Sequence, residues 1–418
     1  MTKRLILAFV FLSWHLVACS NGDSGISSGL PDKPSAEEDS PGTETISEEM
    51  RVKITGEDLY ISAKLDAKTD ILYWFKKCMF NELFTFYRVG TIDNNMPAPV
   101  TLPDASPTSL LNLAYSDNIG PFNITGYGWC GGNHPYLDEV TQTARNIGYR
   151  IYIDGKEIKT DLSTLTKEIK IEVINEIMNP SKADTSSGKT LLNEILCIET
   201  VNYSIYRNNI QVLVPHEFQN ESPVTVQMYY GMQSMFDKET HTLTANGKYV
   251  DWTVQKDVST FTKKEYPSFR RFIEKSANAY QSSYLFADGL GNHEEISDDD
   301  IIFIGNSSNK TYHKIIADRE HKKGDIIHWS GVYTWFKSPV SDDDDLLCYE
   351  GVIDNKKVLF IDCKKSVDRT IQLPVNYTKK SFTIIEKSKS ITITGNKVTA
   401  KGLKIVSDGS GSCVITFD

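Results

Sequence analysis

Apolar and polar residues alternate with a period of two through most of the chain beyond residue 50. In NIGYRIYIDGKEI (146–158), Ile147, Tyr149 and Ile151 share one face, and the Asp-Gly pair at 154–155 is a strong signal for a tight hairpin turn. Successive side chains of a β-strand point to opposite faces, so this period predicts strands. The same alternation occurs in EIKIEVINEI (168–177). Further candidate strands are IQVLV (210–214), VTVQMYY (224–230), YVDWTV (249–254) and IIFIG (301–305).

One segment has helical spacing instead. In PSFRRFIEKSANAY (267–280), Phe269, Phe272 and Ile273 fall on one helical face, and a proline stands in the first turn. A single helix among many strands predicts an all-β fold. We expect a β-sandwich or jelly-roll main domain over residues 51–340, which would be the catalytic domain.

The composition changes at KSPVSDDDDL (337–346), and short strand-like segments then follow one another closely. They include KVLFI, SFTII and CVITF, and several are separated by Asn, Gly, Asp or Ser residues. We therefore expect a small C-terminal β-sheet domain over residues 346–418. No repeat of fixed period is visible, which disfavours a propeller or a solenoid.

The N-terminus has the features of an export signal. Lys3 and Arg4 precede an apolar run (5–14) that is too short to span a bilayer, and LVAC (16–19) resembles the lipobox of bacterial lipoproteins. This predicts a signal peptide over residues 1–18 and lipidation of Cys19; the alternative is an ordinary cleaved signal peptide. Residues 19–50, rich in Ser, Gly, Pro and acidic residues, are expected to form a disordered linker. The protein would then lie at the bacterial cell envelope, on the outer membrane, and contact the lipid bilayer through the Cys19 anchor alone.

The net charge limits the classes of partner that the protein can bind, and the cysteine positions suggest one disulfide. The formal net charge is −10 and no basic cluster stands out, which argues against nucleic acid but not against an acidic substrate. Export permits disulfides. If CYEGVIDNKKVLFIDC folds about a turn at residues 354–357, Cys348 lies opposite Cys363, and a disulfide could join them. The remaining cysteines of the body leave the connectivity open; they are Cys78, Cys130, Cys197 and Cys413.

The most unusual stretch is GYGWCGGNHPY (126–136). Cys130 and His134 stand four apart without a second pair at finger spacing, so we expect no zinc site. The aspartate runs at 297–300 and 342–345 leave calcium open as a ligand, but their spacing does not support it, and no cofactor is expected. The serine-hydrolase elbow and the phosphate-binding loops are absent from the sequence.

Polar segments around this stretch contain the residue types needed for β-elimination on a uronic-acid polysaccharide. Donors must hold the substrate carboxylate, a base must remove the C5 proton, and an acid must protonate the leaving oxygen. We assign Asn133, Arg145 and Gln233 to the carboxylate, His134 to the base, Tyr136 or Tyr230 to the acid, and Trp129 to substrate binding. Each also has an ordinary structural explanation, such as a glycine turn at 131–132 or a surface ion pair at Arg145.

The pattern GGNH, TAR, a strand ending in DG, and YG-x-Q resembles a group of β-rich proteins from bacterial glycan-degradation loci and phage tail fibres. The resemblance covers about residues 110–235 and includes polysaccharide lyases. It implies contact with polysaccharide, acidic in character, and cleavage of it. The C-terminal segment looks like the ancillary sheet of exported polysaccharide-active enzymes, which implies packing support.

The leading hypothesis is a surface-anchored polysaccharide lyase whose partner is an acidic polysaccharide or oligosaccharide. One alternative is a glycan-binding lipoprotein without catalysis, with Trp129, Trp329 and Trp335 as a stacking surface. The other is a glycoside hydrolase that uses two facing carboxylates, for which Glu217 and Asp251 are candidates.

Overall fold

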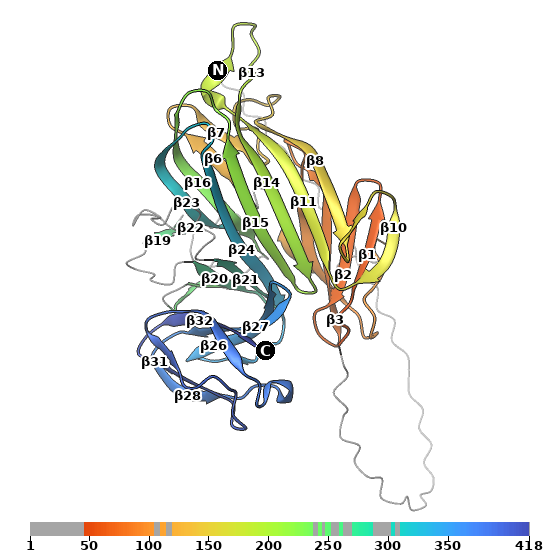
Figure 1. Ribbon diagram of the computed structural model, residues 1–418, viewed down its shortest axis with the longest axis vertical. Coiled ribbons are helices and arrows are strands. Elements are labelled where there is room, and N and C mark those ends of the chain that lie inside the picture. The colour runs from red at the N-terminus through yellow and green to blue at the C-terminus, as the bar shows by residue number, and fades with distance from the viewer. Residues whose placement is uncertain are drawn as a thin grey trace, which may run out of the picture. The chain divides into compact units, whose positions relative to one another are not determined.

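The computed structural model describes residues 46–103, 109–113, 119–236, 241–244, 247–251, 259–261, 270–286, 302–305 and 310–417. These residues form an all-β sandwich of antiparallel sheets, which confirms the predicted fold class (Figure 1). The predicted signal peptide and Cys19 lie outside the described residues. Within the described part of the chain, no helix has the length and apolarity needed to cross a bilayer.

A ten-stranded sheet forms the centre of the fold. Its order is β18-β17-β20-β21-β24-β15-β14-β11-β8-β9. The strands are β18 (Tyr249–Asp251), β17 (His241–Leu243), β20 (Arg271–Lys275), β21 (Tyr280–Leu285), β24 (Ile326–Phe336), β15 (Asn209–Phe218), β14 (Ile195–Tyr206), β11 (Ile169–Met178), β8 (Ala144–Ile153) and β9 (Lys156–Ile158).

Two six-stranded sheets contribute to the same core. The first has the order β10-β1-β2-β3-β4-β5, with β10 (Leu162–Thr166), β1 (Met50–Thr55), β2 (Asp58–Lys64), β3 (Thr69–Cys78), β4 (Leu83–Asp93) and β5 (Ser109–Leu113). The second has the order β19-β22-β23-β16-β6-β7, with β19 (Ser259–Phe261), β22 (Ile302–Gly305), β23 (Lys310–His321), β16 (Val224–Met235), β6 (Pro121–Ile124) and β7 (Gly128–Gly131). A short 3-10 helix (Pro180–Lys182) precedes the pair β12 (Ala183–Asp184) and β13 (Leu191–Leu192).

The alternation read from the sequence sorts these strands into two faces. On β11, Ile171 and Val173 are buried in the core shared by the three sheets, whereas Lys170 and Glu172, which alternate with them, face outward. The hairpin turn after β8 is confirmed: Asp154 has a positive φ of 47° and Gly155 one of 77°, as a tight two-residue turn requires.

The predicted helix over 267–280 is wrong. Residues 271–275 form β20, which pairs with β17 and β21; Phe269 lies outside the described residues. Both faces of β20 are buried, because Phe272 packs into the main core and Ile273 packs into a second core against the C-terminal sheet. Two adjacent apolar residues therefore reflect burial on two sides rather than one helical face.

The C-terminal segment has a core of its own and a second one shared with the ten-stranded sheet. A five-stranded sheet has the order β25-β26-β27-β32-β29, and a three-stranded sheet has the order β28-β31-β30. Tyr349 and Phe360 pack against Tyr284 and Phe336 of the ten-stranded sheet. The strands are β25 (Ser341–Asp342), β26 (Leu346–Ile353), β27 (Lys356–Cys363), β28 (Val367–Ile371), β29 (Phe382–Lys387), β30 (Ile391–Ile393), β31 (Leu403–Ser407) and β32 (Gly411–Phe417), with a 3-10 helix at Val375–Tyr377.

The predicted disulfide between Cys348 and Cys363 is not formed. The hairpin turns through two residues, Asp354 and Asn355, both with positive φ, and not through four. The register therefore shifts by two, so that Cys348 lies opposite Ile361 and not opposite Cys363. All six cysteines of the described residues are buried, and none of them forms a disulfide.

Candidate functional site

The buried side-chain amide of Asn81 holds the glycine turn of GYGWCGGNHPY in place. Gly131 and Gly132 have positive φ values of 78° and 57°, which suit glycine. Asn81, only 1% exposed, donates from its amide to the Gly132 carbonyl at 2.7 Å and accepts from the Thr143 N–H at 3.1 Å. The side chain thus joins the β3–β4 hairpin to the glycine turn and to Thr143, the residue before β8. Sequence reasoning did not identify this residue, since a lone Asn in a hairpin has no distinguishing pattern.

Four predicted site residues lie together beside this turn. The Trp129 ring stacks on Tyr230 (ring centroids 5.6 Å apart, planes at 24°) and on Tyr136 (6.2 Å, 29°). The rings of His134 and Tyr136 make an edge-type contact, with their centroids 5.6 Å apart. All four side chains are half-buried, so part of each reaches solvent. We call Trp129, His134, Tyr136 and Tyr230 the aromatic cluster.

Strand pairing explains why Tyr230 joins three residues almost a hundred positions earlier in the chain. Strand β6 lies between β7 and β16 and pairs with both. Cys130 and Tyr229 point into the core and are fully buried, so their neighbours Trp129 and Tyr230 point outward. Burial raises the pKa of the Cys130 thiol far above its ordinary value, which disfavours the thiolate that a metal would require.

Asn133 is buried under the glycine turn and does not belong to the aromatic cluster. Its side chain is 4% exposed and lines a cavity of about 20 Å³ together with Asn175 and Glu199. A cavity of that size has room for roughly one water molecule and not for a sugar. The predicted role of Asn133 in holding a substrate carboxylate is therefore not supported by its position.

A buried polar network continues inward from that cavity. Asn175 donates to Glu199 at 2.9 Å, and the other oxygen of Glu199 lies 3.0 Å from His216 Nε2. Tyr229 Oη lies 3.4 Å from the same nitrogen and accepts from Trp329 Nε1 at 2.7 Å. Burial and the nearby Glu199 carboxylate raise the pKa of Tyr229 well above its ordinary value.

Sequence reasoning missed Glu199 and His216, although the strand pattern marked both. Glu199 shares the inward face of β14 with Cys197 and Val201, and His216 shares the inward face of β15 with Val214. A charged or polar residue on an otherwise apolar face is the signal that could have identified them.

Arg145 and Gln233 do not stand opposite the cluster. Ala144 is fully buried, so Arg145 points to the outer face of the ten-stranded sheet, where it forms an ion pair with Glu176 and is 58% exposed. Gln233 follows Tyr230 on β16, but its side chain is fully buried. The carboxylate-binding set predicted from the sequence is therefore not assembled.

The structure also does not support the predicted tryptophan stacking surface or the predicted pair of catalytic carboxylates. Trp329 and Trp335 are 1% and 0% exposed, so neither can belong to a stacking surface. Glu217 lies exposed on the outer face of β15, and Asp251 lies on β18, five strands away in the same sheet. At about 4.8 Å per strand their backbones are roughly 24 Å apart, well beyond the 5–10 Å that glycoside hydrolysis uses.

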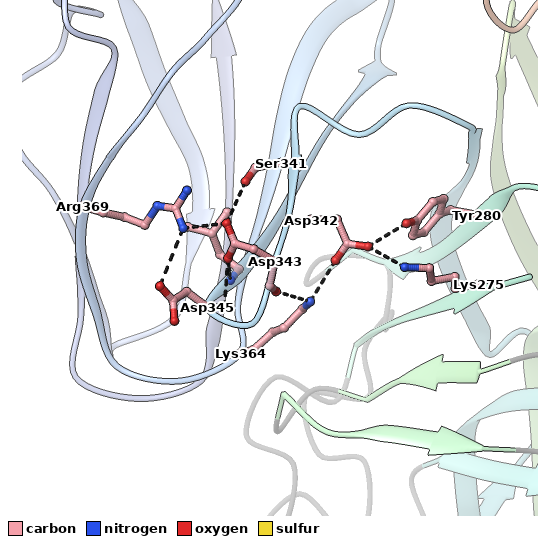
Figure 2. Close-up of polar contacts among 9 residues, drawn as sticks. Lys275, Tyr280, Ser341, Asp342, Asp343, Asp345, Lys364 and Arg369 are labelled. Carbon is pink, nitrogen blue, oxygen red and sulfur yellow. Dashed lines mark hydrogen bonds and ion pairs between the residues drawn. The ribbon is translucent and has the colours of Figure 1, made fainter.

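Three aspartates of the run at 342–345, Asp342, Asp343 and Asp345, are paired with cationic side chains (Figure 2). Asp342 accepts from Lys275 at 2.7 Å and from Lys364 at 2.9 Å, and Asp343 accepts from Arg369 at 2.7 Å. The run at 297–300 lies outside the described residues. In the part of the chain that the structure describes, no group of three or more His, Cys, Asp or Glu residues is placed to hold a metal ion.

Comparison with known proteins gives similarity to solved structures only. No protein-family model matches the chain, and no curated protein does. The solved structures include the GH36 alpha-galactosidase AgaA from Geobacillus stearothermophilus, at 9% identity and a TM-score of 0.34 over 70% of this chain. They also include a polysaccharide lyase, at 7% identity and a TM-score of 0.27 over 82% of this chain. A third is the chondroitin AC lyase of Streptomyces coelicolor A3, at 7% identity and a TM-score of 0.17 over 86% of this chain.

The chain spans less than half the length of each of these proteins: 41%, 45% and 48% in the same order. A likeness of this extent transfers no activity. The function of this protein therefore has to be inferred from its own residues.

Proposed function

We propose that this protein binds a polysaccharide or oligosaccharide on the aromatic cluster. The observation that carries the proposal is the near-parallel stacking of Trp129 with Tyr136 and Tyr230, three half-buried rings on one side of a sheet. The C–H bonds on the face of a sugar ring carry slight positive charge, and the face of an aromatic ring carries the negative side of its quadrupole. A row of rings therefore suits successive sugar units.

The test is a Trp129→Ala variant measured by calorimetry against a panel of neutral and acidic oligosaccharides. Removal of one stacking ring is expected to weaken binding about tenfold or more, since such a contact contributes ~1–3 kcal/mol. The matched control is Trp74→Ala. Trp74 is also half-buried and stacks on Tyr60 at 5.5 Å, but it lies in the first six-stranded sheet. Equal losses in both variants, or full affinity in Trp129→Ala, would contradict the proposal.

A second candidate function is β-elimination at the same cluster. The observation in its favour is the contact of His134 with Tyr136, because a base and an acid are needed side by side on a bound uronic acid. The predicted cationic partner Arg145 faces elsewhere, so the substrate carboxylate would need another donor. Incubation with uronic-acid glycans would show an ultraviolet absorbance from the new double bond. That signal should vanish in His134→Ala, and its absence from the unmodified protein would leave binding alone.

A further inference from the structure

A cavity of about 480 Å³ lies away from the aromatic cluster, between the ten-stranded sheet and two loops of the C-terminal segment. Arg270, Arg271 and Tyr284 line one side, from β20, the residue before it, and β21. The segments 386–390 and 410–412 line the other. Figure 1 shows β20 and β21 next to β32, the strand that begins in the second of these segments.

The charge around this cavity is opposite in sign to that of the whole chain. Four cationic side chains line it, those of Arg270, Arg271, Lys387 and Lys389. Arg270 is paired with Glu386 and Arg271 with Asp362, so the two lysines supply the excess positive charge. The chain as a whole carries a formal net charge of −10. A local excess of cations in an acidic protein attracts an anion, and the low dielectric of a recess strengthens that attraction.

Arg271, one of the lining residues, has a buried guanidinium. It is 3% exposed, and its Nη2 is bound to the Ile361 carbonyl at 3.2 Å and to the Asp362 carboxylate. Among the residues the structure describes, neither Nε nor Nη1 of Arg271 has a hydrogen-bond partner. A planar guanidinium that is fixed on one side and has two N–H-bearing nitrogens without a partner is suited to a carboxylate or a sulfate.

The opposite wall is fixed by hydrogen bonds between its two loops. The Ser388 N–H donates to the Ser412 carbonyl at 2.8 Å, the Ser412 N–H donates to Ser388 Oγ at 2.9 Å, and Ser390 Oγ donates to the Ser410 carbonyl at 3.0 Å. At Gly411 a Cβ atom would lie 2.4 Å from Ser390 Oγ and 2.9 Å from Ser388 Cβ, so a larger residue would displace these serines. A wall fixed before binding loses little conformational entropy when a ligand arrives.

We propose that this cavity binds the acidic group of a saccharide, a carboxylate or a sulfate, with the sugar ring against the serine-lined wall. The guanidinium of Arg271 and the ammonium groups of Lys387 and Lys389 supply the charge, and the serines match a ligand rich in hydroxyl groups. The volume lies within the range of sites for small organic ligands and exceeds the need of a bare inorganic anion. This site is separate from the aromatic cluster and does not require it.

The experiment uses the two exposed lysines, because Arg271→Ala would leave Asp362 buried without its partner and would endanger folding. Calorimetry compares the unmodified protein with the double variant Lys387→Gln, Lys389→Gln. The matched control is Lys397→Gln, Lys401→Gln, which removes the same charge from exposed positions outside the cavity. The probes are trigalacturonate, a sulfated disaccharide, a neutral oligosaccharide of equal length, and sodium sulfate.

We expect the acidic saccharides to bind, the neutral one to bind at least tenfold more weakly, and the Lys387/Lys389 variant to lose about tenfold in affinity while the control keeps it. The same pattern in a Trp129→Ala background separates this site from the aromatic cluster. Equal affinity in all three proteins would overturn the proposal, as would sodium sulfate that binds as tightly as the saccharides. So would acidic-saccharide binding that Trp129→Ala abolishes, a result that would instead support the aromatic cluster.

Discussion

Glu274 on β20 should make the protein less stable as the pH rises through neutrality. Its side chain is fully buried, and within the described part of the chain its polar contacts are uncharged: the Ser234 hydroxyl, the Gln281 amide at 3.0 Å and the Thr311 hydroxyl at 3.4 Å. Burial raises the pKa of this carboxyl from 4.5 to about 8, although the three donors oppose the shift. The group is therefore protonated at pH 7 in the folded state.

The sign of the effect follows from proton binding. Between pH 4.5 and about 8 the folded state holds a proton on Glu274 that the unfolded state has released, so each increase in pH favours unfolding. Over the full window this amounts to about 5 kcal/mol, and between about pH 6 and pH 8 to about 2 kcal/mol. Glu274→Gln removes the titration while it keeps the shape of the side chain.

Urea unfolding of the unmodified protein and of Glu274→Gln at pH 6 and pH 8 measures the difference. The variant should gain about 2 kcal/mol relative to the unmodified protein over this interval. His313 contributes an opposite slope at lower pH, because burial lowers its pKa from 6.5 to about 3, and that contribution is common to both proteins. The control is Glu217→Gln, on the exposed face of β15. A difference between Glu274→Gln and the unmodified protein that stays constant with pH would refute the reasoning.

Three further predictions follow from contacts of the candidate site and from the N-terminal motif. Asn81→Ala should lower the free energy of unfolding by about 1–3 kcal/mol, because it leaves buried backbone groups unpaired, and should weaken glycan binding; urea unfolding and calorimetry measure both. Gly120→Ala should destabilise the protein far more than Gly126→Ala, because the added Cβ would lie 1.4 Å from the Tyr230 carbonyl oxygen, whereas no atom lies within 4 Å at Gly126; thermal unfolding compares the two. Cys19→Ser should move the protein from the membrane fraction to the soluble fraction if the predicted lipidation occurs; equal fractionation would contradict it.

The sequence predicted strands best where only one face of the strand is buried. On β11 the solvent-facing residues supply the polar half of the alternation, so the period of two is visible. On β8 a bulge interrupts the predicted face of Ile147, Tyr149 and Ile151 and leaves Ile147 52% exposed. On β20 both faces are covered, one by the main core and one by the C-terminal sheet, and the period disappears. The tertiary contact that misled the helix prediction joins segments about 75 residues apart, and local spacing does not encode it.

Only those residues of the candidate site that lie close together in the sequence were predictable. Trp129, His134 and Tyr136 lie within eight residues, and the glycine turn presents them together. Arg145 was assigned by residue type alone, although the buried Ala144 next to it places its side chain on the opposite face of the sheet. The disulfide prediction failed for a similarly small reason, since a two-residue turn in place of a four-residue turn shifts the register by two.

Strand β16 connects the buried network to the aromatic cluster. Tyr229 and Tyr230 are consecutive and point to opposite faces, the first toward His216 and the second onto Trp129. A shift of the strand that brought Met228 to the inward position of Tyr229 would remove a hydroxyl from the interior, where the Glu199 and His216 pair is fully enclosed. Because a buried polar group without a partner costs several kcal/mol, the network disfavours that shift. A shift in the other direction would bring Tyr230 inward and keep a hydroxyl there, but it would place Gly231 on the outer face and remove the ring that stacks on Trp129. The stacking of Tyr230 on Trp129 therefore requires the register in which Tyr229 reaches the buried network.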